Sequence, residues 1–262
     1  MKFKRKYLAI PYAIFLSLFV IVPIGLIIFY AFTDANGSLS FDAAKNFFTN
    51  KGNWDVLLVS LFIALQATIL CLLIGFPIAY FLANKNYNKN AVLVMLFIMP
   101  MWINFVLRTT ATRDILFAIG INGGNYPYLA TLIGMVYNYL PFVILPLYTT
   151  MLKLDKSQIE ASADLGANPT QVFFKSIIPQ TIPGIISAVT MTFVPVMSSY
   201  VISDALSEGN IALVGNFIYL NFANNQWNNG SFMAFILLIL VAISMFSTKG
   251  QDKEATNRGG LW

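Results

Sequence analysis

Side chains able to do covalent or metal chemistry are scarce in this sequence. Histidine is absent, which removes the commonest general base and the commonest metal ligand. The one cysteine, Cys71, stands in an apolar run and is expected to be a small buried residue. No GxxxxGK motif followed by Ser or Thr occurs, so the chain is not expected to hydrolyse nucleotide itself. These absences argue against a catalytic or metal site, so non-covalent binding is the chemistry that remains.

The composition indicates that most of this chain lies in a membrane. The chain of 262 residues is 58% hydrophobic and 10% charged, and its mean hydropathy is +0.71. A soluble domain of this length carries roughly a quarter charged residues. Too little polar surface is present to cover a water-soluble globule. We therefore predict an all-α integral membrane protein, with one transmembrane domain over residues 1–248 and a cytoplasmic tail over 249–262.

Charge-free runs mark six spans, because a bilayer core needs about 20 apolar residues in a helix. We expect the spans between Lys6 and Asp34, between Asp55 and Lys85, between Lys89 and Arg108, and over about 128–152, 184–203 and 232–248. The N-terminal run resembles a signal peptide, but it is too long and no A-x-A-like site follows it. We interpret it as a retained first span.

The distribution of basic residues predicts the orientation. Most of them fall before the first span, between spans two and three, between spans four and five, and after span six: Lys2, Lys4, Arg5, Lys6, Lys85, Lys89, Lys153, Lys156, Lys175, Lys249, Lys253 and Arg258. Positively charged loops stay in the cytoplasm, so both termini are expected inside. The net charge of +5 is therefore a topology signal that requires no nucleic acid.

The longest cytoplasmic connection, residues 153–183, has its own helix signals. Ser157 and Glu160 have the spacing of a capping box, and Gly166 suits a left-handed C-terminal cap. Asn168-Pro169 indicates the start of a second helix, which Pro179 and Pro183 are expected to stop. Such an apolar helix pair could rest on lipid headgroups, pack under its own bundle, or bind a partner.

This loop resembles the EAA loop of ABC import permeases, whose pattern is E-A-A, three residues, G, nine residues and I-x-L-P. Glu160, Ala161, Gly166 and Pro179 match in register, while Ser162 replaces the second alanine. Ser176 and Ile178 stand at the isoleucine and leucine positions. The resemblance implies a type I ABC importer permease in a bacterial cytoplasmic membrane, whose loop couples to a separate ATPase subunit.

Nearly the whole chain resembles the spermidine and putrescine branch of that family. The matching stretches include Gly75 to Tyr80, Pro100 to Thr109, Leu165 to Ala167 and Ile182 to Gly184. The branch usually shows R-T-Y-A-W near the end of span three. Here the sequence is Arg108-Thr109-Thr110-Ala111-Thr112, so both aromatic residues are missing. This departure bears on any stacking role of the motif and on the exact substrate.

Polyamines are flexible polycations, so their path is expected to offer carboxylates and aromatic faces. The candidates at the outer half of the spans are Asp204, Glu208, Asp114, Trp102, Tyr200, Tyr137 and Tyr139. The aromatic residues could instead form the interfacial belt, and the carboxylates could be solvated loop charges. Arg108 would repel a polycation, so we interpret it as structural, paired with Asp114 or with backbone carbonyls.

The resemblance also implies partners. Six spans make half a pathway, so a second permease subunit is expected, together with an ATPase pair that binds ATP and Mg²⁺ and an extracytoplasmic solute-binding protein. No cofactor is expected in this chain.

Other functions stay open from the sequence. One is an import permease for an inorganic anion, thiamine, iron or an opine-like compound. A structural membrane protein would not need the EAA loop. A membrane-embedded enzyme is disfavoured because no nucleophile–base pair or metal cluster is visible.

Overall fold

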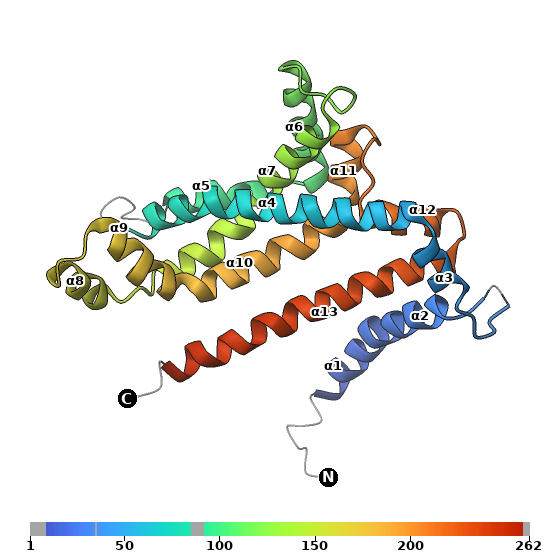
Figure 1. Ribbon diagram of the computed structural model, residues 1–262, viewed down its shortest axis with the longest axis horizontal. Helices are drawn as coiled ribbons and strands as arrows, with labels where there is room; N and C mark the ends of the chain where they lie inside the picture. Colours follow the sequence, from blue (N-terminus) through green and yellow to red (C-terminus); the bar gives the residue numbers. More distant parts are fainter. Residues whose placement is uncertain (1–8, 35, 85–91, 259–262) are drawn as a thin grey trace, which may run out of the picture. The chain divides into compact units, whose positions relative to one another are not determined.

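The computed structural model describes residues 9–34, 36–84 and 92–258, with side chains over 11–34, 36–84 and 92–245 (Figure 1). All of its regular elements are helical; the one isolated β-bridge in the described part joins Thr33 and Leu39. The chain divides into two compact units, residues 1–57 with 217–240 and residues 58–216 with 241–262.

The first unit contains the N-terminal helices and the outer part of the last helix. Its elements are α1 (Ala9–Leu16), the π-helical turn η2 (Ser17–Ile21), α2 (Val22–Ala31), α3 (Asp42–Thr49), the start of α4 (Lys51–Ala83), the end of α12 (Val214–Ala223) and the first half of α13 (Trp227–Arg258). Contacts between aromatic rings hold this unit together. The ring centroids of Phe32 and Phe235 lie 5.2 Å apart, and those of Phe47 and Phe232 lie 5.7 Å apart. Asn228 donates to the Tyr30 carbonyl at 3.1 Å, which ties α13 to the end of α2.

The second unit is built around α7 (Pro127–Met151). The other elements are the rest of α4, α5 (Val92–Ile98), the 3₁₀ turn η3 (Met99–Trp102), α6 (Phe105–Ala118), α8 (Lys156–Asp164), α9 (Pro169–Val172), the π-helical turn η4 (Phe173–Ile177), α10 (Ile178–Ser198) and α11 (Tyr200–Ser207). Helix α7 packs against α10, α11 and α6. Its residues Met135, Val143, Ile144 and Leu147 are fully buried.

Small residues let these helices approach closely, as expected where apolar helices pack inside a bilayer. A Cβ on Gly75 of α4 would lie 3.0 Å from Val143, and one on Gly184 of α10 would lie 2.7 Å from the Thr150 hydroxyl. A Cβ on Gly134 would overlap the Leu206 side chain of α11. Helices α4, α10 and α11 are thus each seated against α7 at a glycine.

The predicted third span is broken. Helix α5 and turn η3 meet α6 at a bend of 97°, because Ile103 is extended and Asn104 caps a new helix by accepting from the backbone N–H groups of Val106 and Leu107. The span therefore does not end before Arg108, as the charge pattern indicated, and Arg108 lies inside α6.

The membrane prediction is confirmed over the described residues. Five helices are long and apolar enough to cross a membrane, over Pro11–Ala31, Lys51–Ala83, Pro127–Met151, Pro169–Ser198 and Trp227–Met245, and the bent pair makes a sixth if it is one span. Helix α13 continues past the predicted end at Thr248 to Arg258. The side chains of Lys2, Lys4, Arg5, Lys6, Lys85, Lys89, Lys249, Lys253 and Arg258, on which the predicted orientation depends, lie outside the described residues.

Candidate functional site

The first helix of the loop over residues 153–183 is α8, which begins at Lys156, one residue before the predicted Ser157, and is capped by Asp155 instead of by a Ser157–Glu160 capping box. Asp155 is the N-cap, and its carboxylate accepts from the Ser157 backbone N–H at 3.0 Å and from the Ser157 hydroxyl at 2.6 Å. The hydrogen bond from this hydroxyl lowers the pKa of Asp155 below its ordinary value. The cap therefore acts while the carboxylate is ionised, and its contribution is lost as the pH falls through this lowered pKa.

The loss of this cap gives a first prediction. In Asp155→Ala the first turn of α8 loses an acceptor, so its amide hydrogens should exchange about fivefold faster. Hydrogen exchange of the intact protein in detergent measures this. Asp164→Ala, at the other end of the same helix, is the matched control and should leave exchange there unchanged. Equal rates in Asp155→Ala and the parent chain would show that the cap is dispensable.

The bend between the two loop helices has the predicted geometry. Gly166 is left-handed, with a φ of +82°. Its N–H donates to the Ala163 carbonyl at 2.9 Å, and the Ala167 N–H donates to the Ser162 carbonyl at 3.2 Å. These two bonds form a Schellman motif, which satisfies the last carbonyls of α8 and reverses the chain within two residues.

The second loop helix starts as predicted but does not stop. Asn168 and Gln171 form a reciprocal capping box around Pro169. Pro179 and Pro183 were expected to end this helix, and that prediction is wrong, because α9, η4 and α10 form one apolar run over Pro169–Ser198. In the π-helical turn, the Ile178 N–H donates to the Phe173 carbonyl five residues earlier, directly before the proline that lacks a donor.

The two loop helices are joined by a contact that the sequence did not reveal. The hydroxyl groups of Ser162 and Ser176 lie 2.6 Å apart. Both residues depart from the EAA pattern, and the structure pairs them with each other. The loop also joins α10 directly, because the Asp155 N–H donates to the Gln180 side chain at 2.9 Å. The helix pair is thus connected to the membrane helix that follows it.

The loop presents a surface suited to a partner. The side chain of Leu165 is 89% exposed at the bend, an unusual position for a large apolar residue outside the spans. Phe174 is 60% exposed at the start of the apolar run over Pro169–Ser198. Glu160 is exposed and lines a cavity of about 350 Å³ with Lys156 of α8, Tyr80 of α4 and Met151 of α7. Ala161 is exposed as well, and Pro179 lies at the start of α10.

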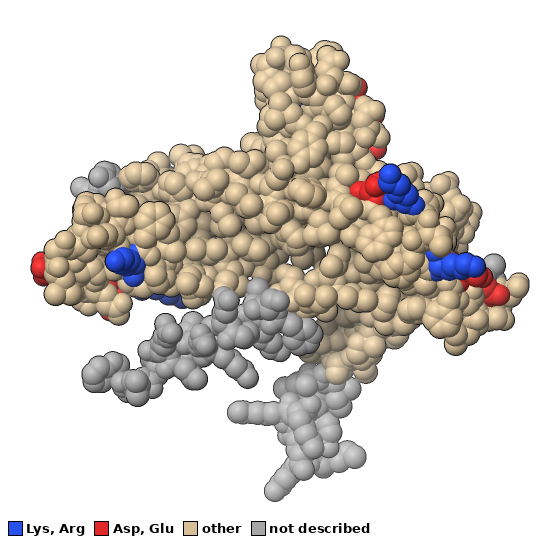
Figure 2. Space-filling view, in the orientation of Figure 1, with Lys and Arg blue, Asp and Glu red and all other residues tan. Residues whose placement is uncertain are grey.

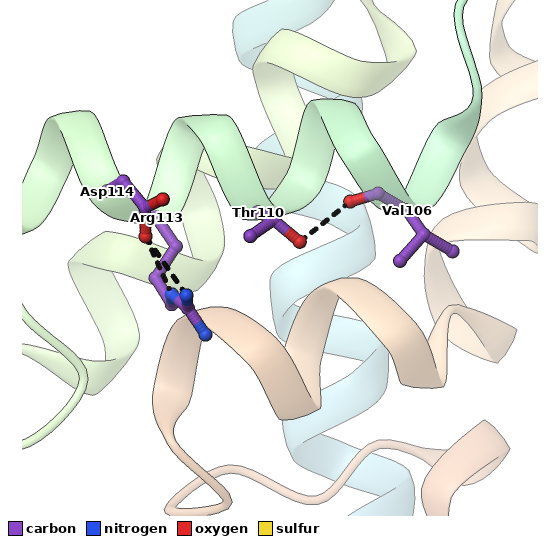
Figure 3. Close-up of polar contacts among 4 residues, drawn as sticks. All are labelled: Val106, Thr110, Arg113 and Asp114. Carbon is purple, nitrogen blue, oxygen red and sulfur yellow. Dashed lines mark hydrogen bonds and ion pairs between the residues drawn. The ribbon is translucent and has the colours of Figure 1, made fainter.

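The predicted acidic residues lie on helices α6 and α11, which pack together with α7. Asp204 is exposed on α11, and Glu208 caps that helix in a left-handed conformation with a φ of +52°. Figure 2 shows acidic side chains at the edge of the lobe that α6 and α11 form. Asp114 of α6 is exposed but already paired, because its carboxylate accepts from Arg113 Nε and Nη2 (Figure 3). Asp204 and Glu208 are therefore the more available carboxylates.

The aromatic candidates are dispersed. Trp102 is 85% exposed at the break before α6, Tyr200 is 40% exposed at the start of α11, and Tyr137 is 46% exposed on α7. Thr110 and Thr112 stand where the branch has aromatic residues. The Thr110 hydroxyl donates to the Val106 carbonyl (Figure 3), and the Thr112 hydroxyl donates to the Arg108 carbonyl. These two threonines offer the path neither a ring nor an unbonded hydroxyl.

Arg108 does not have the partner expected for it. Its side chain is 6% exposed, and its Nε and Nη1 atoms are buried without a hydrogen-bond partner. Asp114 instead pairs with Arg113. The Phe105 ring centroid lies 6.0 Å from Arg108 Cζ, so among the described residues this cation has an aromatic face and no carboxylate. Tyr139 of α7 is buried, and its hydroxyl donates to the Pro195 carbonyl at 3.2 Å.

Comparison with known proteins gives a consistent family. The family model for "Binding-protein-dependent transport system inner membrane component" matches residues 75–253. The spermidine/putrescine transport system permease protein PotB of Haemophilus influenzae is 34% identical, with 94% of this chain and 92% of that protein covered. PotB of Escherichia coli is 35% identical over 73% of this chain and 75% of the relative. A PotB homolog of Mycoplasma genitalium is 28% identical over 95% of this chain and 92% of its own.

Solved structures support the fold. A chain of a bacterial alginate ABC transporter, crystallised with a periplasmic protein carrying an alginate pentasaccharide, has a TM-score of 0.70 at 11% identity, with 96% of this chain and 94% of that chain covered. An amino acid ABC transporter has a TM-score of 0.54 at 17% identity over 76% of this chain and 92% of that chain. At these identities the likeness concerns the fold alone.

Proposed function

Since the chain belongs to the binding-protein-dependent transport system inner membrane components, the permease subunits of ABC importers, we propose that its solute is a polyamine such as spermidine or putrescine. The chain is a multi-pass membrane protein of an importer that works with a solute-binding protein. It is a permease subunit and not an enzyme. The proposal of a polyamine rests on relatives that bear the spermidine/putrescine name across most of this chain.

The loop over residues 153–183 couples this chain to a separate ATPase subunit in our proposal. The observation that carries it is the helix pair closed at Gly166, which exposes Leu165, Phe174 and Glu160. Its direct continuation into α10 would pass a movement of the loop into the membrane. ATP and Mg²⁺ would bind to that partner.

Six spans form half of a path, so a second permease subunit, most simply a different chain, completes it in this proposal. Lys153, Lys156 and Lys175 lie on the loop side, which supports a cytoplasmic loop and cytoplasmic termini. The opposite side would then carry Asp204 and Glu208 toward the binding protein, where carboxylates could receive a polycation.

The test is ATP-dependent uptake of labelled spermidine, putrescine and thiamine into vesicles that carry this chain with its partner subunits. We expect saturable spermidine uptake that unlabelled polyamine reduces by competition. In Asp204→Asn the path loses a charge-assisted hydrogen-bond acceptor, so spermidine uptake should fall about tenfold.

Asp42→Asn is the matched control, because Asp42 is also exposed and its carboxylate bonds to the neighbouring Ser40. This variant should transport normally. Uptake of thiamine with spermidine ignored would keep the importer and discard the polyamine. Unchanged spermidine uptake in Asp204→Asn would remove Asp204 from the path and leave the substrate in place.

A further inference from the structure

Arg108 is a buried cation without a matching acid. Its side chain is 94% buried on the broken span, and Nε and Nη1 have no hydrogen-bond partner. Over residues 11–34, 36–84 and 92–245, the ion pair present joins Arg113 and Asp114 instead. The Phe105 ring centroid lies 6.0 Å from Arg108 Cζ, a weaker contact than a carboxylate would make. A buried charge without an acidic partner is costly to keep inside a membrane protein, so its presence calls for a role beyond packing.

The surroundings of Arg108 connect two breaks in the membrane helices. Asn104, four residues earlier, begins α6 after the 97° bend. Helix α6 packs on both α7 and α11. The Tyr139 hydroxyl of α7 donates to the Pro195 carbonyl of α10 at 3.2 Å, four residues before Ser199, at which α10 ends and α11 begins. The helix that carries Arg108 therefore packs on the two helices, α7 and α11, that adjoin the α10–α11 break.

Other polar atoms near this junction are also unsatisfied. Asn138, next to Tyr139, is 1% exposed and its Oδ1 has no partner. Thr192, three residues before Pro195, is fully buried and its hydroxyl has no partner either. Buried polar groups without a partner destabilise the state that buries them, and a state in which water reaches them would relieve that cost. Interrupted helices are tolerated at membrane depth where they line a water-filled cavity.

We propose that Arg108 is the cation barrier of the closed path, a specificity residue that prevents positively charged solutes from leaking when the transporter is idle. Helix breaks and unsatisfied polar groups mark a section of the path that is collapsed in this state. A fixed positive charge there repels cations, and a polycation is repelled once for each of its charges. Opening at the α10–α11 break would release Tyr139 and move the charge aside.

This inference rests on the proposed function only in supposing that the solute is cationic, and its test does not use that solute. The complete transporter is reconstituted into K⁺-loaded vesicles without ATP, and the release of K⁺ and of Cl⁻ is measured. We expect Arg108→Gln and Arg108→Met to raise K⁺ release about tenfold over the parent complex and to leave Cl⁻ release unchanged. Arg108→Lys, which keeps the charge, should leak no more than the parent.

Arg113→Gln is the matched control. It removes the same charge from the same helix, but Arg113 is exposed and paired with Asp114 (Figure 3), so K⁺ release should not change. Equal increases in K⁺ and Cl⁻ release with Arg108→Gln would mean that the side chain blocks by size, which overturns the proposal. Assembled charge-free variants that stay tight would overturn it as well.

A purely structural role is also distinguishable. If Arg108→Gln and Arg108→Met both fail to assemble while Arg108→Lys assembles, the charge is needed for folding or for a carboxylate of a partner subunit, and the barrier is rejected. Failure of the polyamine assignment would appear only in the uptake assay, so the two results are independent.

Discussion

Replacing Gly166 by Asp should abolish ATP-driven uptake, by at least about a hundredfold, while leaving the protein inserted and assembled in the membrane. Gly166 has a φ of +82°, where an L side chain is strained by roughly 1–2 kcal/mol. A Cβ there would meet no atom of this chain within 4 Å. The expected loss therefore comes mainly from the space that an ATPase subunit would occupy and from tilting Leu165 at the bend. Uptake and solute-stimulated ATP hydrolysis in the same vesicles measure the effect.

Gly120→Asp is a control with the same local geometry. Gly120 has a φ of +84°, nothing lies within 4 Å of its Cβ position, and it closes α6 by the same pair of hydrogen bonds, to Phe117 and Leu116. It lies outside the loop over residues 153–183, so uptake should remain within about twofold of normal. If both variants lose uptake equally, backbone strain explains the result and the coupling role of Gly166 fails.

The loop could be predicted from sequence because its signals are local. Asn168 before Pro169 and Gly166 at the bend each determine their own cap within a few residues, and the structure has both. The Ser162–Ser176 contact joins positions fourteen residues apart. Each serine separately reads as a small departure from the motif, and only the folded loop shows that they pair.

The broken spans could not be predicted, because hydropathy does not report direction. The run over residues 92–118 is apolar enough for one span, and the bend depends on whether Asn104 caps a new helix or bonds elsewhere. Pro179 gave a misleading stop signal. In the π-helical turn directly before it, the backbone hydrogen bond already spans five residues instead of four, so the helix continues although proline has no N–H to donate. The predicted fifth span ends at about residue 203, but α10 ends at Ser198 and α11 (Tyr200–Ser207) begins before that point, with Ser199 between them.

The candidate site was predictable in its residue types more than in its partners. The sequence singles out Arg108 as a structural charge and offers Asp114 or backbone carbonyls as its partner, but Asp114 pairs with Arg113, because two arginines stand near it along one helix. The hydrogen bond from Tyr139 to the Pro195 carbonyl depends on how α7 packs on α10, which no local pattern encodes. Tertiary packing thus determines which charge is buried and which is paired.

Gly215→Ala should destabilise the second unit more than any other glycine-to-alanine change in it. A Cβ at Gly215 would lie 2.0 Å from the Ser198 carbonyl oxygen and 2.7 Å from its carbon, both backbone atoms at the α10–α11 break. Because backbone atoms cannot rotate away, the start of α12 must move away from the α10–α11 break. This should lower the free energy of unfolding by about 3 kcal/mol or more. Thermal unfolding of the detergent-solubilised protein should shift down by about 10 °C.

Two further variants decide whether the cause is backbone overlap at this position. A Cβ at Gly134 would come within 1.8 Å of an atom at the end of the flexible Leu206 side chain, which can turn aside, so Gly134→Ala should cost less, and Leu206→Val should restore part of the loss. Gly124→Ala, whose Cβ would make ordinary contacts at 3.5 Å and 3.7 Å, should leave the unfolding temperature unchanged.

If Gly215→Ala unfolds at the same temperature as Gly124→Ala, α12 is not held against Ser198, and the junction beside Tyr139 is looser than the structure shows. A loose junction would also weaken the barrier at Arg108, since the Tyr139 hydroxyl donates to the carbonyl of Pro195, three residues before Ser198. The unfolding temperature of Gly215→Ala and the K⁺ release of the Arg108 variants therefore report on the same region, where α7 meets the end of α10.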